Sequence, residues 1–220
     1  GVSSGCGSSN VMESLGYRFT NDNDLLRRQM EHAGICFLHA PLFHPAMKAV
    51  APIRRELGIK TFFNMLGPLV NPSNPGSQLV GVYDLELARL FQYMYQQGSK
   101  RFSIIHSIDG YDEISLTGPF KVITQKGERL MHPYDLNLSA TTPEAIAGGH
   151  KVEEAAKIFT QVISGNGTET QNNVVIANAG MAIHCFYPEK DLLTCIEMAR
   201  ESLMSGKARQ SLKTLIDTQD

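Results

Sequence analysis

The apolar positions of this chain form short continuous runs that alternate with longer stretches of helical spacing. Runs of strand length occupy 35–38, 78–83, 102–106 and 120–124, and a turn signal, Lys126-Gly127, follows the last of them. Helical spacing occupies 11–16, 20–34, 46–57, 84–98, 152–163, 170–186 and 191–216, with a break expected at Gly206. Strands that alternate with helices are typical of an α/β fold, so we predict a mainly parallel β-sheet flanked by helices.

Several of these helices begin or end at residues suited to capping. We predict that Asn10 is the N-cap of the first helix, with Glu13 as its capping-box partner and Gly16 as its stop. Asp84 is predicted to cap the helix after 78–83, and Gly34 to end the helix before 35–38. The loops that follow the apolar runs are where α/β sheets gather their ligands.

Length, composition and charge indicate an ordinary soluble globular protein. The 220 residues suit one domain with a full core, and 42% hydrophobic with 19% charged residues is an average balance. A net charge of -2 provides no general field for nucleic acid or an anionic membrane, so we expect neither as a partner. No apolar run approaches the ~20 residues that span a bilayer.

Two further features bear on location and completeness. The four cysteines are widely spaced and form no C-x-x-C pair, which favours reduced thiols in a cytoplasmic protein over a disulfide or zinc framework. The chain begins with glycine inside what reads as a working loop, and no initiator Met precedes it. We therefore expect the chain to be part of a longer protein.

The first ten residues are the strongest candidate for binding an anion. Seven of residues 1–10 are glycine or serine, and the first helix follows without a spacer. Such a loop exposes backbone N–H groups and hydroxyls at a helix N-terminus, which favours phosphate. The alternative is a flexible glycine/serine linker. The paired serines, Ser3-Ser4 and Ser8-Ser9, favour the phosphate site slightly.

Adjacent carboxylates follow the third apolar run, 102–106. Asp112 and Glu113 lie in the loop after 102–106, where they could hold a hard divalent cation such as Mg²⁺, which commonly takes one or two carboxylates plus substrate phosphates. A solvated turn is the alternative explanation for such a pair.

A third candidate begins at His44 and runs to Arg54-Arg55. Adjacent arginines on a helix cannot face the same side, so at most one of them points into a pocket, where it would bind a carboxylate or phosphate. The alternative is solvated surface. His44 is as well explained by capping or packing as by chemistry.

Taken together, these blocks resemble the anthranilate phosphoribosyltransferase family over essentially the whole chain. The opening Gly-Val-Ser-Ser and Gly-Ser are similar to the end of the family's phosphate-loop motif, which continues into a helix. The blocks at 44–47, 50–59, 63–72 and 110–115 complete the pattern, and Arg-Arg-Glu-Leu-Gly with Asn-Met-Leu-Gly-Pro-Leu-Val-Asn-Pro is specific.

The resemblance implies a fold, a reaction and a set of site residues. The fold would be the C-terminal α/β domain of the phosphoribosyltransferases, spanning 1–220. The reaction would transfer phosphoribosyl from phosphoribosyl pyrophosphate (PRPP) to the amine of anthranilate, in tryptophan biosynthesis, with Mg²⁺ as cofactor. By position, the PRPP residues are Gly1, Val2, Ser3, Ser4 and Ser8, the anthranilate residues are Arg54, His44, Pro41 and Gly67, and the metal ligands are Asp112 and Glu113.

Departures from the family pattern limit what this chain is expected to do alone. The family's first phosphate loop and its Lys-His-Gly-Asn-Arg segment would precede residue 1, together with an N-terminal helical domain that forms a homodimer contact. We therefore expect the parent protein to be a homodimer, and this fragment alone to be inactive or nearly so. Cys6 stands where the family often has serine, and a thiol is a weaker hydrogen-bond donor.

Competing functions remain open at this stage. A pyrimidine nucleoside phosphorylase shares the fold and a serine-rich phosphate loop, but the Asp112-Glu113 pair and the 64–72 block speak against it. A non-catalytic relative that binds nucleic acid would need a basic groove, for which the sequence offers no Lys/Arg cluster beyond Arg54-Arg55.

Overall fold

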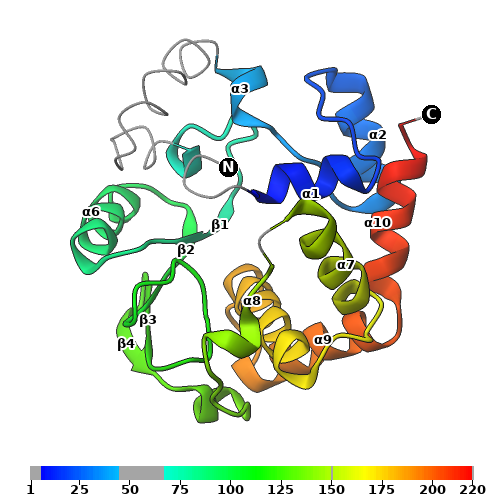
Figure 1. The fold of residues 1–220 in the computed structure, drawn as a ribbon. Helices are drawn as coiled ribbons and strands as arrows, with labels where there is room; N and C mark the ends of the chain where they lie inside the picture. Colours follow the sequence, from blue (N-terminus) through cyan, green and yellow to red (C-terminus); the bar gives the residue numbers. More distant parts are fainter. Residues whose placement is uncertain (1–5, 45–66, 150, 220) are drawn as a thin grey trace, which may run out of the picture. The chain divides into compact units, whose positions relative to one another are not determined.

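The computed structural model describes residues 6–44, 67–149 and 151–219 (Figure 1). The chain divides into two compact units, one made of 1–74, 148–163 and 206–220, the other of 75–147 and 164–205. The β-sheet belongs to the second unit, and the described elements of the first unit are helices. A β-sheet that is covered by helices confirms the predicted α/β class.

The sheet of the second unit has four strands in the order β1 (Ser77–Gly81), β2 (Arg101–Ser107), β3 (Phe120–Thr124) and β4 (Gly127–Met131). Strand β1 runs parallel to β2 after a crossover through α6 (Leu85–Gln96), whereas β2–β3 and β3–β4 are antiparallel. The described sheet is therefore mixed rather than mainly parallel. The reason is local: no helix separates β2 from β3, and the predicted turn at Lys126-Gly127 makes β3 and β4 a hairpin.

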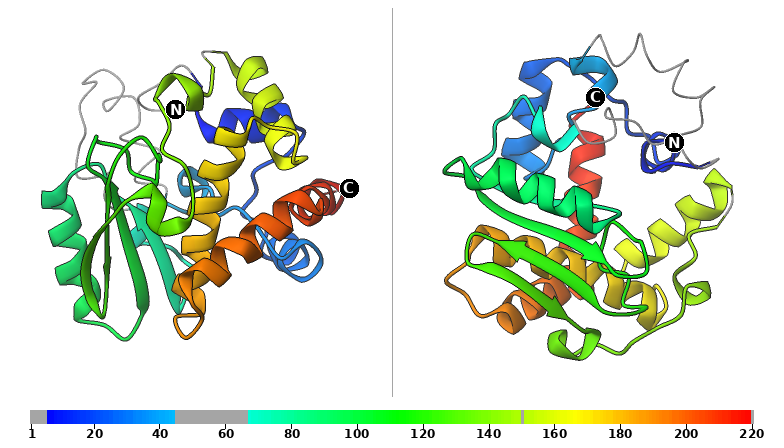
Figure 2. Two further views of the ribbon diagram at one scale, coloured as in Figure 1. Left: turned by 90° about the horizontal axis from the view of Figure 1, so that it is seen from below. Right: turned by 90° about the vertical axis from the view of Figure 1, so that its left-hand side faces the viewer.

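Helices cover both faces of this sheet. Helix α6 packs on β2, while α8 (Glu169–Phe186) packs against β1 and β2 from the opposite face and carries α9 (Leu192–Met204) behind it (Figure 2). Gly180 lets α8 and α9 approach closely, because a Cβ there would lie 2.9 Å from Ile196 Cα. The core between sheet and helices includes Ile105, Ile114, Phe120, Met181 and Ile196.

The second unit also contains two short 3₁₀ helices. These short helices are Pro133–Leu136 and Glu144–Ile146. Asp84 caps α6 as predicted, since its carboxylate accepts from Leu87 N–H at 2.7 Å. The predicted break at Gly206, where φ is +82°, separates α9 from α10 (Lys207–Asp217). None of the helices in the described ranges combines the length and apolar character needed to cross a bilayer.

The first unit includes the helices α1 (Ser8–Ser14), α2 (Asn23–Ala33), α3 (Ala40–Phe43), α7 (Val152–Ile163) and α10. The predicted end of α2 at Gly34 is confirmed, with φ at +72°. The predicted strand at 35–38 is wrong, because this segment is irregular and pairs with none of the described strands. Its apolar character serves an aromatic cluster instead, in which Phe37 lies 5.1 Å from Tyr17 and 6.0 Å from Phe19 between ring centroids.

The first helix begins earlier than predicted, which changes the role of Asn10. Helix α1 starts at Ser8 with Gly7 as its N-cap, so Asn10 is three positions inside it. The Asn10 side-chain oxygen accepts from Gly7 N–H at 3.1 Å and thereby closes the helix start. Asn10 therefore plays the part that the sequence had suggested for Glu13.

Candidate functional site

The predicted metal ligands lie in a hydrogen-bonded loop directly after β2. Ser107, the last residue of β2, donates its N–H to Tyr111 O at 3.0 Å and accepts from Gly110 N–H at 2.9 Å. Gly110 has φ at +100°, a conformation that L side chains rarely adopt, and this turns the chain back on itself. Asp112 and Glu113 follow at once, and both side chains are exposed. The loop therefore presents two carboxylates to solvent at the end of a buried strand.

The end of β1 touches this loop backbone to backbone. A Cβ built on Gly81 would lie 1.5 Å from Asp112 O, so only glycine fits at this position. The next residue, Val82, donates its N–H to Ile105 O at 2.9 Å, and the buried His106 ring donates from Nδ1 to Val82 O at 2.9 Å. These contacts fix the carboxyl ends of β1 and β2 around the carboxylate loop.

The electrostatics of the pair favour a bound cation. Partial burial of the carboxyl raises the pKa of Glu113, and the neighbouring Asp112 charge raises it further. Nearby protein partly desolvates the Glu113 carboxyl. Because the residue as a whole is exposed, a cation can still reach that carboxyl from solvent. An accessible carboxylate that is destabilised by a like charge is stabilised when a cation binds both groups.

The donor set fits magnesium better than a softer metal. In the described part of the chain, no cluster of three or more His, Cys, Asp or Glu side chains is arranged to hold a metal ion. The pair itself supplies hard oxygen ligands, and Mg²⁺ commonly binds through one or two carboxylates together with substrate phosphates. Asp112 and Glu113 therefore fit a magnesium ion.

Three of the predicted anthranilate residues lie in the described part of the first unit. Pro41 is exposed on α3, and His44 follows the end of that helix. His44 Nε2 lies 3.1 Å from Val70 O, which joins the end of α3 to the segment that contains Gly67. A Cβ on Gly67 would meet no atom within 4 Å, so open space borders this backbone. Arg54, the predicted carboxylate receptor, lies outside the described residues.

The predicted PRPP residues are described only at Ser8. This residue opens α1, and it is exposed. Gly1, Val2, Ser3 and Ser4 lie outside the described residues. The exposed start of α1 is compatible with the predicted anion site, which remains a prediction.

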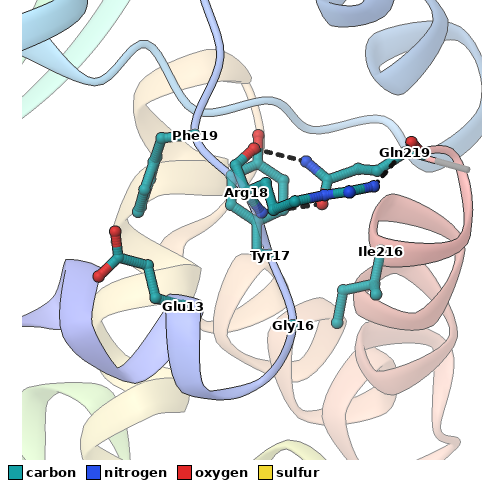
Figure 3. A pocket seen from close by; sticks show the side chains of 7 residues that line it. All are labelled: Glu13, Gly16, Tyr17, Arg18, Phe19, Ile216 and Gln219. Carbon is teal, nitrogen blue, oxygen red and sulfur yellow. Dashed lines mark hydrogen bonds between the residues drawn. The ribbon is translucent and has the colours of Figure 1, made fainter.

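A pocket of about 590 Å³ lies elsewhere in the first unit (Figure 3). Figure 3 shows Arg18 and Gln219 joined across it: Arg18 N–H donates to Gln219 Oε1 at 2.9 Å, and Gln219 Nε2 donates to Arg18 O at 2.6 Å. None of the predicted site residues that the structure describes lines this pocket. Its lining residues are Glu13, Gly16, Tyr17, Arg18, Phe19, Ile216 and Gln219.

The residues that hold the carboxylate loop were not found by sequence reasoning. Asn178 and Ser107 form hydrogen bonds to the backbone beside the carboxylates. Gly81 lacks a Cβ and therefore leaves room for the Asp112 backbone. Gly81 offered a signal, since an isolated glycine in an apolar strand often marks a close backbone approach. Asn178 offered none, because its partner is 64 residues away in the sequence.

Comparison with known proteins identifies relatives over nearly the whole chain. A family model described as "Glycosyl transferase family, a/b domain" matches residues 1–209. The anthranilate phosphoribosyltransferase of Flavobacterium psychrophilum is 56% identical over 215 residues, which cover 98% of this chain and 65% of that protein. The enzyme of the same name from Bacteroides fragilis is 54% identical over 217 residues, which cover 99% of this chain and 66% of that protein. The predicted resemblance is thereby confirmed, and the chain spans 65–66% of the length of these two relatives.

Solved structures of proteins that carry the same name as these relatives share the fold of this chain. Anthranilate phosphoribosyltransferase from Thermus thermophilus matches with a TM-score of 0.87 and 31% identity, covering 96% of this chain and 64% of that one. The enzyme from Saccharomyces cerevisiae, in complex with PRPP and Mg, matches with a TM-score of 0.86 and 27% identity, covering 96% and 61%.

Proposed function

Because this chain belongs to the glycosyl transferase family with the a/b domain, we propose that it is the a/b portion of an anthranilate phosphoribosyltransferase. The enzyme would transfer the phosphoribosyl group of PRPP to the amine of anthranilate and release pyrophosphate, as a step of tryptophan biosynthesis. The proposal is supported by 56% identity to a relative of that name. The structural observation that carries it is the carboxylate pair exposed on a fixed loop after β2.

Asp112 and Glu113 are the proposed magnesium ligands. Breaking the bond between the ribose carbon and the pyrophosphate oxygen builds negative charge on the leaving group. Magnesium, when bound, would stabilise that charge. The two carboxylates would hold the cation at the end of β2, and the hydrogen-bonded loop would keep them in place without further reorganisation.

The proposed PRPP residues act through backbone N–H groups and hydroxyls. Gly1, Val2, Ser3 and Ser4 would bind the phosphates, and the exposed Ser8 would add a hydroxyl from the first turn of α1. A helix N-terminus favours negative charge because its first N–H groups have no partners within the helix.

Anthranilate needs positioning more than activation. Its aromatic amine is neutral at pH 7 and already nucleophilic, so holding it in line with the ribose carbon contributes most of what is required. Arg54 would bind the anthranilate carboxylate through charge-assisted hydrogen bonds. Pro41, His44 and Gly67 would border the path of the ring, and the contact between His44 and Val70 supports this grouping.

We further propose a place for this chain in a larger assembly. Residues 1–220 would form the C-terminal α/β domain, and a preceding helical domain would supply the first phosphate loop and the contact of a homodimer. The protein would work in the cytoplasm, without nucleic acid or membrane as partner. On this proposal the 220-residue chain alone transfers phosphoribosyl slowly or not at all.

The test is a chimera in which the remaining N-terminal part comes from the Flavobacterium psychrophilum relative. We expect the chimera to consume anthranilate in a reaction that requires both PRPP and Mg²⁺. The reaction is monitored by the loss of anthranilate fluorescence. Arg54→Ala should raise the apparent KM for anthranilate by about 10–100-fold, because a hydrogen bond to a charged group is lost.

Arg55→Ala is the matched control. On the helix that the sequence predicts for 46–57, adjacent arginines would face different sides, so this variant should leave that KM within about twofold of the parent value. An unchanged KM in Arg54→Ala would remove Arg54 from the site. Phosphate-dependent cleavage of thymidine without anthranilate consumption would replace the proposal with a nucleoside phosphorylase.

A further inference from the structure

The backbone that follows the carboxylate pair is held by side chains rather than by a neighbouring strand. Ile114 comes directly after Glu113 and is fully buried in the core of the second unit. Two peptide groups flank it, and each has one N–H and one C=O that need partners away from water. Both groups find these partners in Asn178 and Ser107.

Asn178 binds Ile114 from helix α8. Its side-chain oxygen accepts from Ile114 N–H at 2.9 Å, and its side-chain nitrogen donates to Ile114 O at 2.9 Å. This is the exchange that a residue of an antiparallel neighbouring strand would make. The same nitrogen also donates to Val174 O at 2.9 Å, one turn earlier on α8, so the amide is fixed to its own helix.

Ser107 binds the outer ends of the same two peptide groups from strand β2. Its hydroxyl donates to Glu113 O at 2.6 Å and accepts from Ser115 N–H at 3.3 Å. Ser107 is completely buried, so these bonds are shielded from competing water. Asn178 and Ser107 thus hold both ends of each peptide group on either side of Ile114.

The chain beyond this point adopts a conformation that needs such support. Leu116 has φ at +61°, a region that a bulky residue with a Cβ rarely enters, and its side chain is only 1% exposed. Leu116 O accepts from Thr141 N–H at 2.9 Å, and the Thr117 hydroxyl donates to Asp109. Strained backbone persists only where its surroundings over-determine it, and here it lies three residues beyond Glu113.

We propose that Asn178 and Ser107 are the positioning residues of the metal site, and that they aim Asp112 and Glu113 at a single cation. This proposal rests on the proposed magnesium ligands. Adjacent side chains on an extended backbone point to opposite sides, so two neighbouring carboxylates converge on one ion only if the backbone between them is held in a turn. Neither positioning residue touches the ion, and each acts through the backbone of residues 113–115.

The test measures binding of Mn²⁺, an EPR-visible substitute for Mg²⁺, to the 220-residue chain. Asn178→Leu keeps the approximate volume of the side chain and removes all its hydrogen bonds, and it should weaken Mn²⁺ binding about tenfold. Ser107→Ala removes a small hydroxyl from the opposite side of the loop and should weaken binding in the same direction. The serine variant keeps the test decisive if the asparagine variant does not fold.

The matched control is Asn172→Leu on the same helix. Asn172 is 8% exposed, and its amide donates to Gly167 O at 3.3 Å, away from the carboxylate loop. This variant should lower the melting temperature but leave the Mn²⁺ dissociation constant within about twofold of the original, as expected for independent sites. A purely structural role for Asn178 would make the two asparagine variants alike.

Three results would overturn the proposal. The first is unchanged Mn²⁺ affinity in both Asn178→Leu and Ser107→Ala. The second is a loss in Asn172→Leu as large as that in Asn178→Leu. The third is undiminished Mn²⁺ binding when Asp112→Asn is combined with Glu113→Gln, and this result alone would also remove the proposed magnesium ligands.

Discussion

Replacing Gly81 with alanine tests how tightly the carboxylate loop is held. The new methyl carbon would lie 1.5 Å from Asp112 O and 2.6 Å from Asp112 C, whereas ordinary contact begins at 3.4 Å. The obstructing atoms are backbone, so no side-chain rotation relieves the overlap. Either β1 or the loop must move by about 2 Å, since the gap is that far below normal van der Waals separation.

Neither side can move without breaking other interactions. Strand β1 is paired with β2 in parallel register, with Gly81 opposite Ile105, and the loop is held by Asn178 and Ser107. We therefore expect Gly81→Ala to cost about 3 kcal/mol, the upper part of the range for overpacking. That cost corresponds to a fall in melting temperature of roughly 6–12 °C for a chain of this size.

The assay pairs thermal unfolding with Mn²⁺ binding, because a displaced loop should also weaken metal binding about tenfold. Gly76→Ala is the control: it lies just before β1, and a Cβ there would meet no atom within 4 Å. Its free energy of unfolding should change by no more than about 0.5 kcal/mol. A Gly81→Ala protein with the original melting temperature and Mn²⁺ affinity would refute the reasoning.

Three other predictions concern charge, capping and packing. Because burial and the Asp112 charge raise the pKa of Glu113, the folded chain retains a proton that the unfolded chain has lost, so stability should fall as pH rises through the raised pKa. Mn²⁺ affinity should rise over the same pH window, and Glu113→Gln should remove both trends. Asp191→Ala should lower the free energy of unfolding by about 1 kcal/mol in urea titrations, because its carboxylate accepts two hydrogen bonds from the first turn of α9. Ile196→Ala should cost about 2–5 kcal/mol by the same measurement, because the side chain is 1% exposed between α8 and α9.

Local signals in the sequence predicted most of the elements. The helix capped by Asp84, the helix ended by Gly34 and the break at Gly206 each depend on a residue type with one dominant conformational role. The turn at Lys126-Gly127 was predicted for the same reason, whereas the strand that follows it, β4, was not. Such signals determine structure within a few residues of themselves, so they can be recognised in the sequence without knowledge of distant contacts.

Predictions that depended on a distant partner were less successful. An apolar run such as 35–38 becomes a strand only beside another strand, and here Phe37 packs among aromatic rings instead. The sheet is mixed because β3 follows β2 without a helix, although both runs look alike as apolar segments. Periodicity does not distinguish a parallel from an antiparallel neighbour.

In the candidate site, too, the features with a local sequence pattern were predicted and those that depend on distant partners were not. The sequence placed Asp112 and Glu113 correctly in the loop after a buried strand, because carboxylates beyond a strand end form a local pattern. The hydrogen bonds from Asn178 join residues 64 apart, and no local pattern announces them. The carboxylates could therefore be predicted, whereas the structure was needed to show what holds them.

The most direct test of the proposed function is a calorimetric titration of the chain with PRPP, with and without Mg²⁺. We expect binding that requires Mg²⁺ and that disappears when Asp112→Asn is combined with Glu113→Gln, since the cation would link these carboxylates to the pyrophosphate. Binding of equal strength in the absence of Mg²⁺ and in the double variant would contradict the assignment of a magnesium-dependent PRPP site to this loop.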